Sequence, residues 1–190
     1  MKILYGVVGE GMGHATRSRV VIERLVARGH DVRVVASAKA EAYLGRFMGA
    51  PSARGRVEVV PIRGLSLRYG DEGIDRAATV AHNLAGAPDL LLRNAAAYVD
   101  LVGSFRPDLV FSDFDSFAYL FAKQTGVPVV SIDNIQMLAR FKQPDWVKKG
   151  SKVSFQLTKA FVKAKLPGCK HYLITTFFRP EIRKDDKLIG

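Results

Sequence analysis

Short apolar runs alternate with segments of helical periodicity along most of the chain. Runs rich in β-branched residues predict strands over residues 2–9, 31–37, 56–62, 107–114, 127–134 and 171–178. Between them, apolar residues recur at the spacing of one helix face and predict helices over residues 14–29, 39–49, 88–105, 116–125 and 151–165. Residues 63–78 are rich in Gly, Arg and Asp without a period, and this pattern predicts a long loop.

Strands that are apolar throughout and alternate with helices are typical of a parallel sheet covered on both faces. We therefore expect an α/β fold with a Rossmann-like, doubly wound parallel sheet. Ligands of such sheets bind beyond the carboxyl ends of the strands. The segments expected along that rim are residues 9–14, 37–39, 113–116 and 133–136.

Length and composition suit one sizeable domain with a core of its own, because the chain has 190 residues of which 48% are hydrophobic. Cys169 is the single cysteine, which excludes an internal disulfide and a cysteine-based metal site. No apolar run reaches the ~18 residues needed to cross a bilayer, and the N-terminus lacks the features of a signal peptide. These observations predict a cytoplasmic protein, and no residue pattern calls for a metal or a cofactor.

A net charge of +11, from 29 basic and 18 acidic residues, indicates an anionic partner. Residues 138–165 carry eight of the basic residues against one acid, and residues 153–164 combine an apolar stripe with lysines. A basic amphipathic helix with flanking aromatics can lie on the inner face of an anionic membrane, which would make the protein peripheral. The expected membrane or acceptor contacts are Trp146, Lys148, Lys149, Lys152, Lys159 and Lys163. The alternative is an ordinary surface helix with a solvated basic face; no recognition motif points to nucleic acid.

The stretch GVVGEGMGHATRSRV, residues 6–20, is a glycine-rich loop that follows the first predicted strand. A dinucleotide-binding fingerprint needs G-x-G-x-x-G. Counting from Gly9 or Gly11, the third glycine is replaced by His14 or Thr16. No P-loop motif is present either, so the sequence excludes the P-loop and argues against NAD binding.

Charges near the loop do not decide whether it binds a phosphate group. Glu10 would repel a pyrophosphate, whereas Arg17 and Arg19 oppose the helix dipole unless they meet an anion. The second strand ends without the acid that binds a ribose, although Ser37 and Lys39 would suit the 2′-phosphate of NADP. A non-catalytic nucleotide or NADP-binding module therefore stays an alternative.

Four segments, in order, resemble one family. They are GEGMGHATRS, RPDLVFSDFDSFAYLFA, VPVVSIDN and ITTFF, and they resemble the N-terminal, acceptor-side half of GT-B glycosyltransferases of the glucuronosyltransferase-like and MurG-type branch. The resemblance implies sugar transfer from a nucleotide-diphosphate donor to a hydroxyl acceptor, a lipid or lipid-linked sugar being one candidate. It also implies that residues 1–190 form the acceptor-side domain and that a donor-binding domain is absent from this chain. A sugar-nucleotide epimerase of the same fold is a further alternative.

The resemblance implies that His14 deprotonates the acceptor hydroxyl and that Asp113 holds His14. The chemistry agrees, since a group that titrates near neutrality suits removal of a hydroxyl proton and a carboxylate fixes the tautomer of the ring. The alternatives are that His14 merely caps or packs, and that Asp113 or Asp115 caps the helix at residue 116. The expected substrate contacts are Gly9, Gly11, Gly13, Arg17, Asp133, Asn134 and Gln136. The last three are otherwise turn formers.

Overall fold

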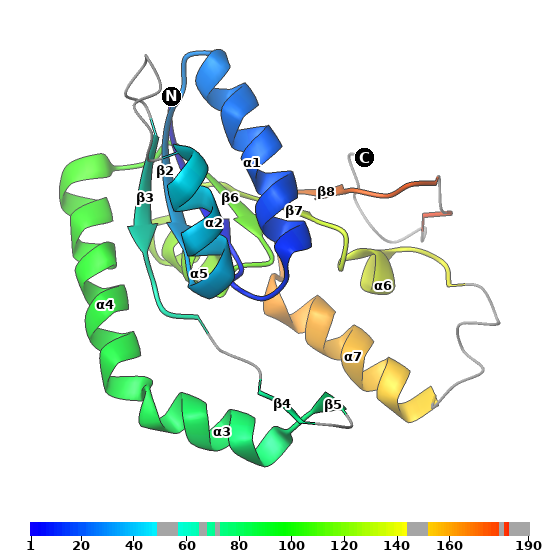
Figure 1. Cartoon of the computed structure of the whole chain (residues 1–190). Coiled ribbons are helices and arrows are strands. Elements are labelled where there is room, and N and C mark those ends of the chain that lie inside the picture. Colours follow the sequence, from blue (N-terminus) through cyan, green and yellow to red (C-terminus); the bar gives the residue numbers. More distant parts are fainter. Residues whose placement is uncertain (49–56, 65–67, 71–72, 144–151, 179–180, 183–190) are drawn as a thin grey trace.

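The chain folds around one six-stranded parallel sheet in the strand order β3-β2-β1-β6-β7-β8 (Figure 1). A computed structural model describes residues 1–48, 57–64, 68–70, 73–143, 152–178 and 181–182. The order reverses between β1 and β6, which is the arrangement of a doubly wound sheet. The predicted fold class is confirmed.

The strands of this sheet are β1 (Lys2–Val7), β2 (Asp31–Ala36), β3 (Val57–Pro61), β6 (Leu109–Asp113), β7 (Val129–Asp133) and β8 (His171–Ile174). The helices are α1 (Met12–Ala27), α2 (Ala38–Met48), α3 (Arg76–Ala85), α4 (Ala87–Asp100), α5 (Ser116–Thr125), α6 (Met137–Arg140) and α7 (Lys152–Lys165). A π-helical turn η1 (Leu101–Phe105) continues α4, and β4 (Tyr69–Gly70) pairs with β5 (Gly73–Ile74) in a small antiparallel ribbon.

Alternate residues of each strand enter two separate cores, one on each face of the sheet. In β1, Ile3 and Tyr5 join the core under α1 and α2, whereas Leu4 joins the core under α4, α5 and α7. All three side chains are almost completely buried. Burial on both faces explains why these strands are apolar throughout rather than alternating.

The structure corrects the prediction of a long loop over residues 63–78. This segment contains the β4–β5 ribbon, and α3 begins at Arg76. Asp75 caps α3, because its carboxylate accepts a hydrogen bond from the amide of Ala78. The helix leaves Val80 and Leu84 exposed, so its apolar residues do not mark a buried face from which a period can be read.

The carboxyl ends of the central strands meet at one rim. Val7 ends β1 and pairs with Asp113, which ends β6, and the amide of Val8 donates to the Asp113 carbonyl oxygen at 3.2 Å. Loops that leave these strands therefore start side by side, although about a hundred residues separate them in the sequence. Within the described residues, no helix combines the length and apolarity that a membrane crossing requires.

Candidate functional site

His14 and Asp113 meet at this rim. His14 lies in the first turn of α1, and its Nδ1 is 2.6 Å from Oδ1 of Asp113. The Asp113 side chain is fully buried, whereas 12% of the His14 side-chain surface is exposed. The structure thus brings together the two residues that the sequence predicted as a pair, and it leaves the ring accessible from the rim.

Two further side chains of α1 bind the same carboxylate. Arg17 donates from Nη2 to Oδ1 at 2.5 Å and from Nε to Oδ2 at 3.2 Å, and Ser18 donates from its hydroxyl to Oδ2 at 2.7 Å. Arg17 also reaches Thr175, just beyond β8, at 3.4 Å. A cation near the start of a helix opposes the helix dipole unless it meets an anion, and the anion here is Asp113. The sequence singled out Arg17 as a substrate contact, which stays a prediction.

The turn after β6 separates two buried carboxylates. Asp115, not Asp113, caps α5, because its Oδ1 accepts a hydrogen bond from the amide of Ala118 at 2.8 Å. Burial raises the pKa of Asp115 to about 6, an effect that Lys165 partly offsets. The ambiguity between the two aspartates in the sequence is resolved, since Asp113 contacts His14 and Asp115 caps the helix.

Three glycines of the first loop differ in why the structure has glycine at their positions. A Cβ on Gly9 would lie 2.4 Å from Oγ and 2.6 Å from the carbonyl oxygen of Ser37, so this glycine lets the loops after β1 and β2 pack together. Gly11 has φ +86°, the left-handed region that favours glycine. Around Gly13, no atom counted in the same way lies within 4 Å of a Cβ position, so a ligand has room to approach the backbone there. Substrate contact by the three glycines stays a prediction.

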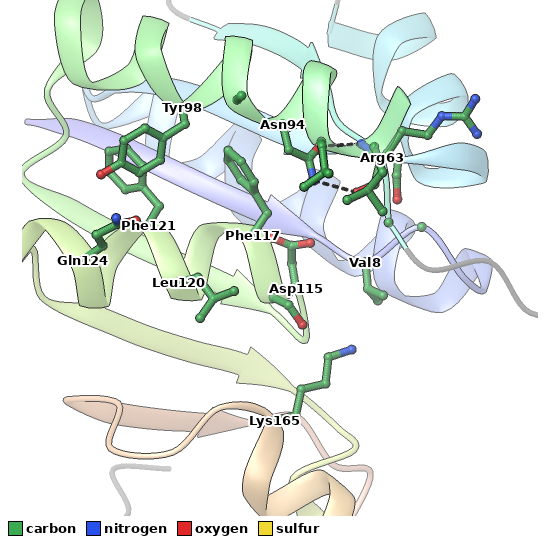
Figure 2. Close-up of a pocket in the computed structure, with 17 residues that line it drawn as sticks. Val8, Arg63, Asn94, Tyr98, Asp115, Phe117, Leu120, Phe121, Gln124 and Lys165 are labelled. Atoms are coloured by element: carbon green, nitrogen blue, oxygen red, sulfur yellow. Dashed lines mark hydrogen bonds between the residues drawn. The ribbon is translucent and has the colours of Figure 1, made fainter. Parts of the chain in front are cut away.

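A cavity of about 520 Å³ opens beside the rim, between α4 and α5 (Figure 2). Its walls are mainly apolar, and its polar lining residues include Asp115, Lys165 and Asn94. The large apolar and aromatic side chains and the charged groups of the lining include Tyr98, Phe117, Leu120, Phe121, Asp115 and Lys165. The volume lies within the range that is typical of pockets for small molecules.

The ring of Phe114 lies close to His14 and to Lys165, one of the residues that line the cavity. The ring centroids of Phe114 and His14 lie 6.5 Å apart, and Lys165 Nζ lies 4.1 Å from the Phe114 centroid. Figure 2 shows Lys165 below Asp115 and Val8, which line the same cavity. Burial lowers the pKa of Lys165, an effect that the negative charges of Asp115 and Asp133 oppose. Sequence reasoning missed Lys165 as a site residue, although its place in a basic helix was visible.

The predicted contacts after β7 lie mostly inside the protein. Asp133 is fully buried, and it accepts hydrogen bonds from the amide of Gln136 at 2.7 Å and from the hydroxyl of Ser131 at 2.8 Å. Gln136 is 1% exposed and accepts from Arg140, whereas Asn134 is exposed. Burial raises the pKa of Asp133. Asp133 and Gln136 thus have a structural role in this turn. Substrate binding by Asp133, Asn134 and Gln136 stays a prediction.

Helix α7 turns its predicted apolar stripe to solvent. Val153, Leu157 and Phe161 are 70%, 67% and 60% exposed, whereas Val162 and the following Leu166 are buried against the sheet. Lys152 begins this helix, Lys163 is exposed, and Lys159 is half-buried. Trp146, Lys148 and Lys149 lie outside the described residues.

The chain matches known glycosyltransferases in sequence and in fold. A family model described as "Glycosyl transferase family 1" matches residues 1–189. An L-arabinokinase of Arabidopsis thaliana is 28% identical over 130 residues, which are 68% of this chain and 12% of that protein.

Two solved structures are similar in fold. UGT89C1 of Arabidopsis thaliana complexed with UDP has a TM-score of 0.56 at 16% identity, over 93% of this chain and 42% of that one. UGT2 of Phytolacca americana, complexed with UDP-2fluoro-glucose and pterostilbene, has a TM-score of 0.55 at 17% identity, over 93% and 48%. The chain thus spans less than half the length of these proteins. The likeness to GT-B glycosyltransferases is confirmed.

Proposed function

Because this chain belongs to glycosyl transferase family 1, we propose that it is the acceptor-binding half of an enzyme that moves a sugar from a nucleotide-diphosphate donor to a hydroxyl group. The observation that carries this proposal is the 2.6 Å contact of His14 with buried Asp113 at the rim, close to a cavity of about 520 Å³. The donor nucleotide would be held mainly by a second half of the enzyme. This chain by itself would then be inactive.

In this proposal His14 is the general base. The Nδ1 proton of the ring is donated to Asp113, and Nε2 takes the proton of the acceptor hydroxyl while its oxygen attacks the anomeric carbon of the donor. The nucleoside diphosphate leaves with the electron pair of the bond that breaks. The buried carboxylate stabilises the imidazolium that forms. General-base catalysis of this kind contributes about 10² to 10⁴ in rate.

The cavity indicates the kind of acceptor. Tyr98, Phe117 and Leu120 offer apolar surface for an aromatic or aliphatic body, and Lys165 of the same cavity lies over the Phe114 ring, which is also near His14. An acceptor of this shape would bind by its body and present a hydroxyl at the rim. UDP-sugars are the proposed donors, since the similar plant enzymes were solved with UDP or a UDP-sugar analogue.

The exposed face of α7 supports a membrane-bound or lipid-linked acceptor. Val153, Leu157 and Phe161 form an apolar stripe one helix turn apart, with Lys163 exposed on the same helix. Phe161 also packs edge-on against Phe114, at 6.4 Å between ring centroids, so the stripe ends next to the site. An amphipathic helix of this kind inserts its apolar face at a lipid surface, where each nearby lysine contributes about 1 kcal/mol on an anionic membrane.

A turnover assay on the full-length protein tests the catalytic part. UDP release from UDP-glucose is measured with pterostilbene as the probe acceptor, for the wild type, His14→Ala and His30→Ala. His14→Ala is expected to lower turnover at least ~10²-fold. His30→Ala is the matched control, because His30 precedes β2 at the opposite end of the sheet. Equal turnover in the wild type and His14→Ala would contradict the base assignment.

A vesicle assay tests the membrane part separately. Co-sedimentation is compared on vesicles of neutral lipid and on vesicles with a third of anionic lipid. Leu157→Glu is expected to weaken binding to the anionic vesicles about tenfold, whereas Val20→Glu is the control. Val20 is equally exposed, at 66%, but lies on α1. Equal binding to both kinds of vesicle, or equal losses in both variants, would end this part of the proposal.

A further inference from the structure

Arg17 makes the pair of His14 and Asp113 a group of three. Its Nη2 lies 2.5 Å from Asp113 Oδ1 and also 3.0 Å from His14 Nδ1, which itself contacts the same oxygen at 2.6 Å. Its Nε donates to the second oxygen of Asp113, and its Nη1 donates to Thr175. The guanidinium is thereby fixed on three sides, and 17% of its side-chain surface is exposed.

The 2.6 Å contact between His14 Nδ1 and Asp113 Oδ1 needs a proton between the two atoms. If Asp113 is ionised, Nδ1 must carry a proton, because a bare nitrogen at 2.6 Å from a carboxylate oxygen would set two lone pairs against each other. Nε2 is then bare. If the pair takes up a second proton, that proton goes to Nε2. The shared proton then lies either on Asp113, beside a neutral Nε2–H ring, or on Nδ1 of an imidazolium. In this second arrangement the ring has no lone pair at Nε2 for a hydroxyl proton.

The surroundings would favour the second arrangement without Arg17. Asp113 is completely buried, and two other buried carboxylates, Asp115 and Asp133, act on it electrostatically. Burial and like charges both disfavour the ionised form of a carboxyl group. Lys165 lies over the Phe114 ring rather than against Asp113. Arg17 is the cation that the structure places in contact with this carboxylate, and it does so through two nitrogens.

We propose that Arg17 is a positioning residue, which keeps Asp113 ionised and so holds His14 in the Nδ1–H tautomer with Nε2 bare. This inference rests on the proposed function, because only a base needs that tautomer. It gives the arginine a role distinct from substrate binding. The charge matters more than the hydrogen bonds, since Ser18 also donates to Asp113 but brings no charge.

Nitrogen-15 NMR of the 190-residue chain tests this role, with the His14 signals assigned by their loss in His14→Gln. At pH 8 the wild type is expected to show a protonated Nδ1 and a bare Nε2. In Arg17→Gln the Nε2–H form is expected to gain population, because the charge next to Asp113, 3.0 Å from Nδ1, is gone. Arg17→Lys keeps the charge and is expected to stay near the wild type. Ser18→Ala, which removes a neutral donor, is the control.

Two results would overturn the inference. One is an unchanged, wild-type tautomer in Arg17→Gln. The other is a change of tautomer in Arg17→Lys as large as that in Arg17→Gln. Should Arg17→Gln fail to fold, Arg17→Lys alone decides, since a retained tautomer supports the role of the charge and a lost one refutes it. The NMR measurement does not depend on sugar transfer. It therefore tests the role of Arg17 even if the proposed function is wrong.

Discussion

Asp115 gives the sharpest test of the electrostatics next to the cavity. Its carboxylate is 5% exposed, and burial raises its pKa from 3.8 to about 6. The proposed perturbation is Asp115→Asn. Asparagine is a good N-cap, so its carbonyl oxygen can keep the hydrogen bond from the Ala118 amide while the side chain stays neutral at every pH.

The expected magnitude follows from the shift in pKa. The folded state holds the Asp115 proton more tightly than the unfolded chain does, so the wild type loses stability as the pH rises from about 4 through 6. At 1.36 kcal/mol for each pH unit, the loss is complete above pH 7 and amounts to about 3 kcal/mol. The neutral asparagine does not share this loss. The free energy of unfolding of Asp115→Asn, minus that of the wild type, should therefore rise by about 3 kcal/mol between pH 4 and pH 7.5.

Urea unfolding followed by circular dichroism at half-unit steps of pH measures this difference. Taking the difference between two variants cancels the titration of all unaffected groups. Asp75→Asn is the matched control, because Asp75 caps α3 in the same way, with a 2.9 Å hydrogen bond from the Ala78 amide, but is exposed. Because Asp75 is exposed, this variant measures the effect of replacing a capping carboxylate by an amide without the contribution of burial. Parallel profiles for the two variants would refute the reasoning, and so would a loss of stability in Asp115→Asn that grows with pH.

Three further expectations concern the loops and the cavity. Gly9→Ala should destabilise the chain by about 1–3 kcal/mol in urea unfolding, because its Cβ would clash with the Ser37 backbone. Gly13→Ala should be neutral or stabilising by up to ~1 kcal/mol in the same assay, since that site is open and helical. Lys165→Met should raise the pKa of Asp115 above about 6, because the Lys165 charge holds it down; the pH window of the stability loss then moves upward, and an unmoved window would contradict this.

The sheet could be predicted from the sequence because its strands are buried on both faces. A run such as KILYGV has few polar residues, which is typical of a strand that is covered on both faces of a parallel sheet. The α3 helix and the β4–β5 ribbon carry no such signal. Val80 and Leu84 of α3 are exposed, and the two strands of the ribbon are two residues long. Periodicity reports burial, and elements that bury little are invisible to it.

The site was predictable only where a strand end fixes a residue. The family resemblance singled out His14 and Asp113. The topology explains why both lie at one rim, because Asp113 ends β6 and His14 follows β1 after a short loop. The direction in which a helix side chain points could not be predicted from the sequence. Arg17 reaches back to Asp113, 96 residues away in the sequence, and Lys165 arrives at the cavity from a helix whose orientation no pattern reveals. These contacts depend on how the helices dock, which the packing of the whole domain decides.

The backbone at Phe114 is strained, and this strained turn directs the carboxylates of Asp113 and Asp115 to opposite faces of the sheet. Residues two apart in a strand point to the same face. Asp113 nevertheless binds side chains of α1 on one face, whereas Asp115 caps α5 on the other. Phe114 between them has φ 55°, a left-handed conformation that costs a bulky residue about 1–3 kcal/mol. The rings of His14 and Phe161 and the ammonium of Lys165 surround its side chain, so the packing of the site itself holds the strained turn in place.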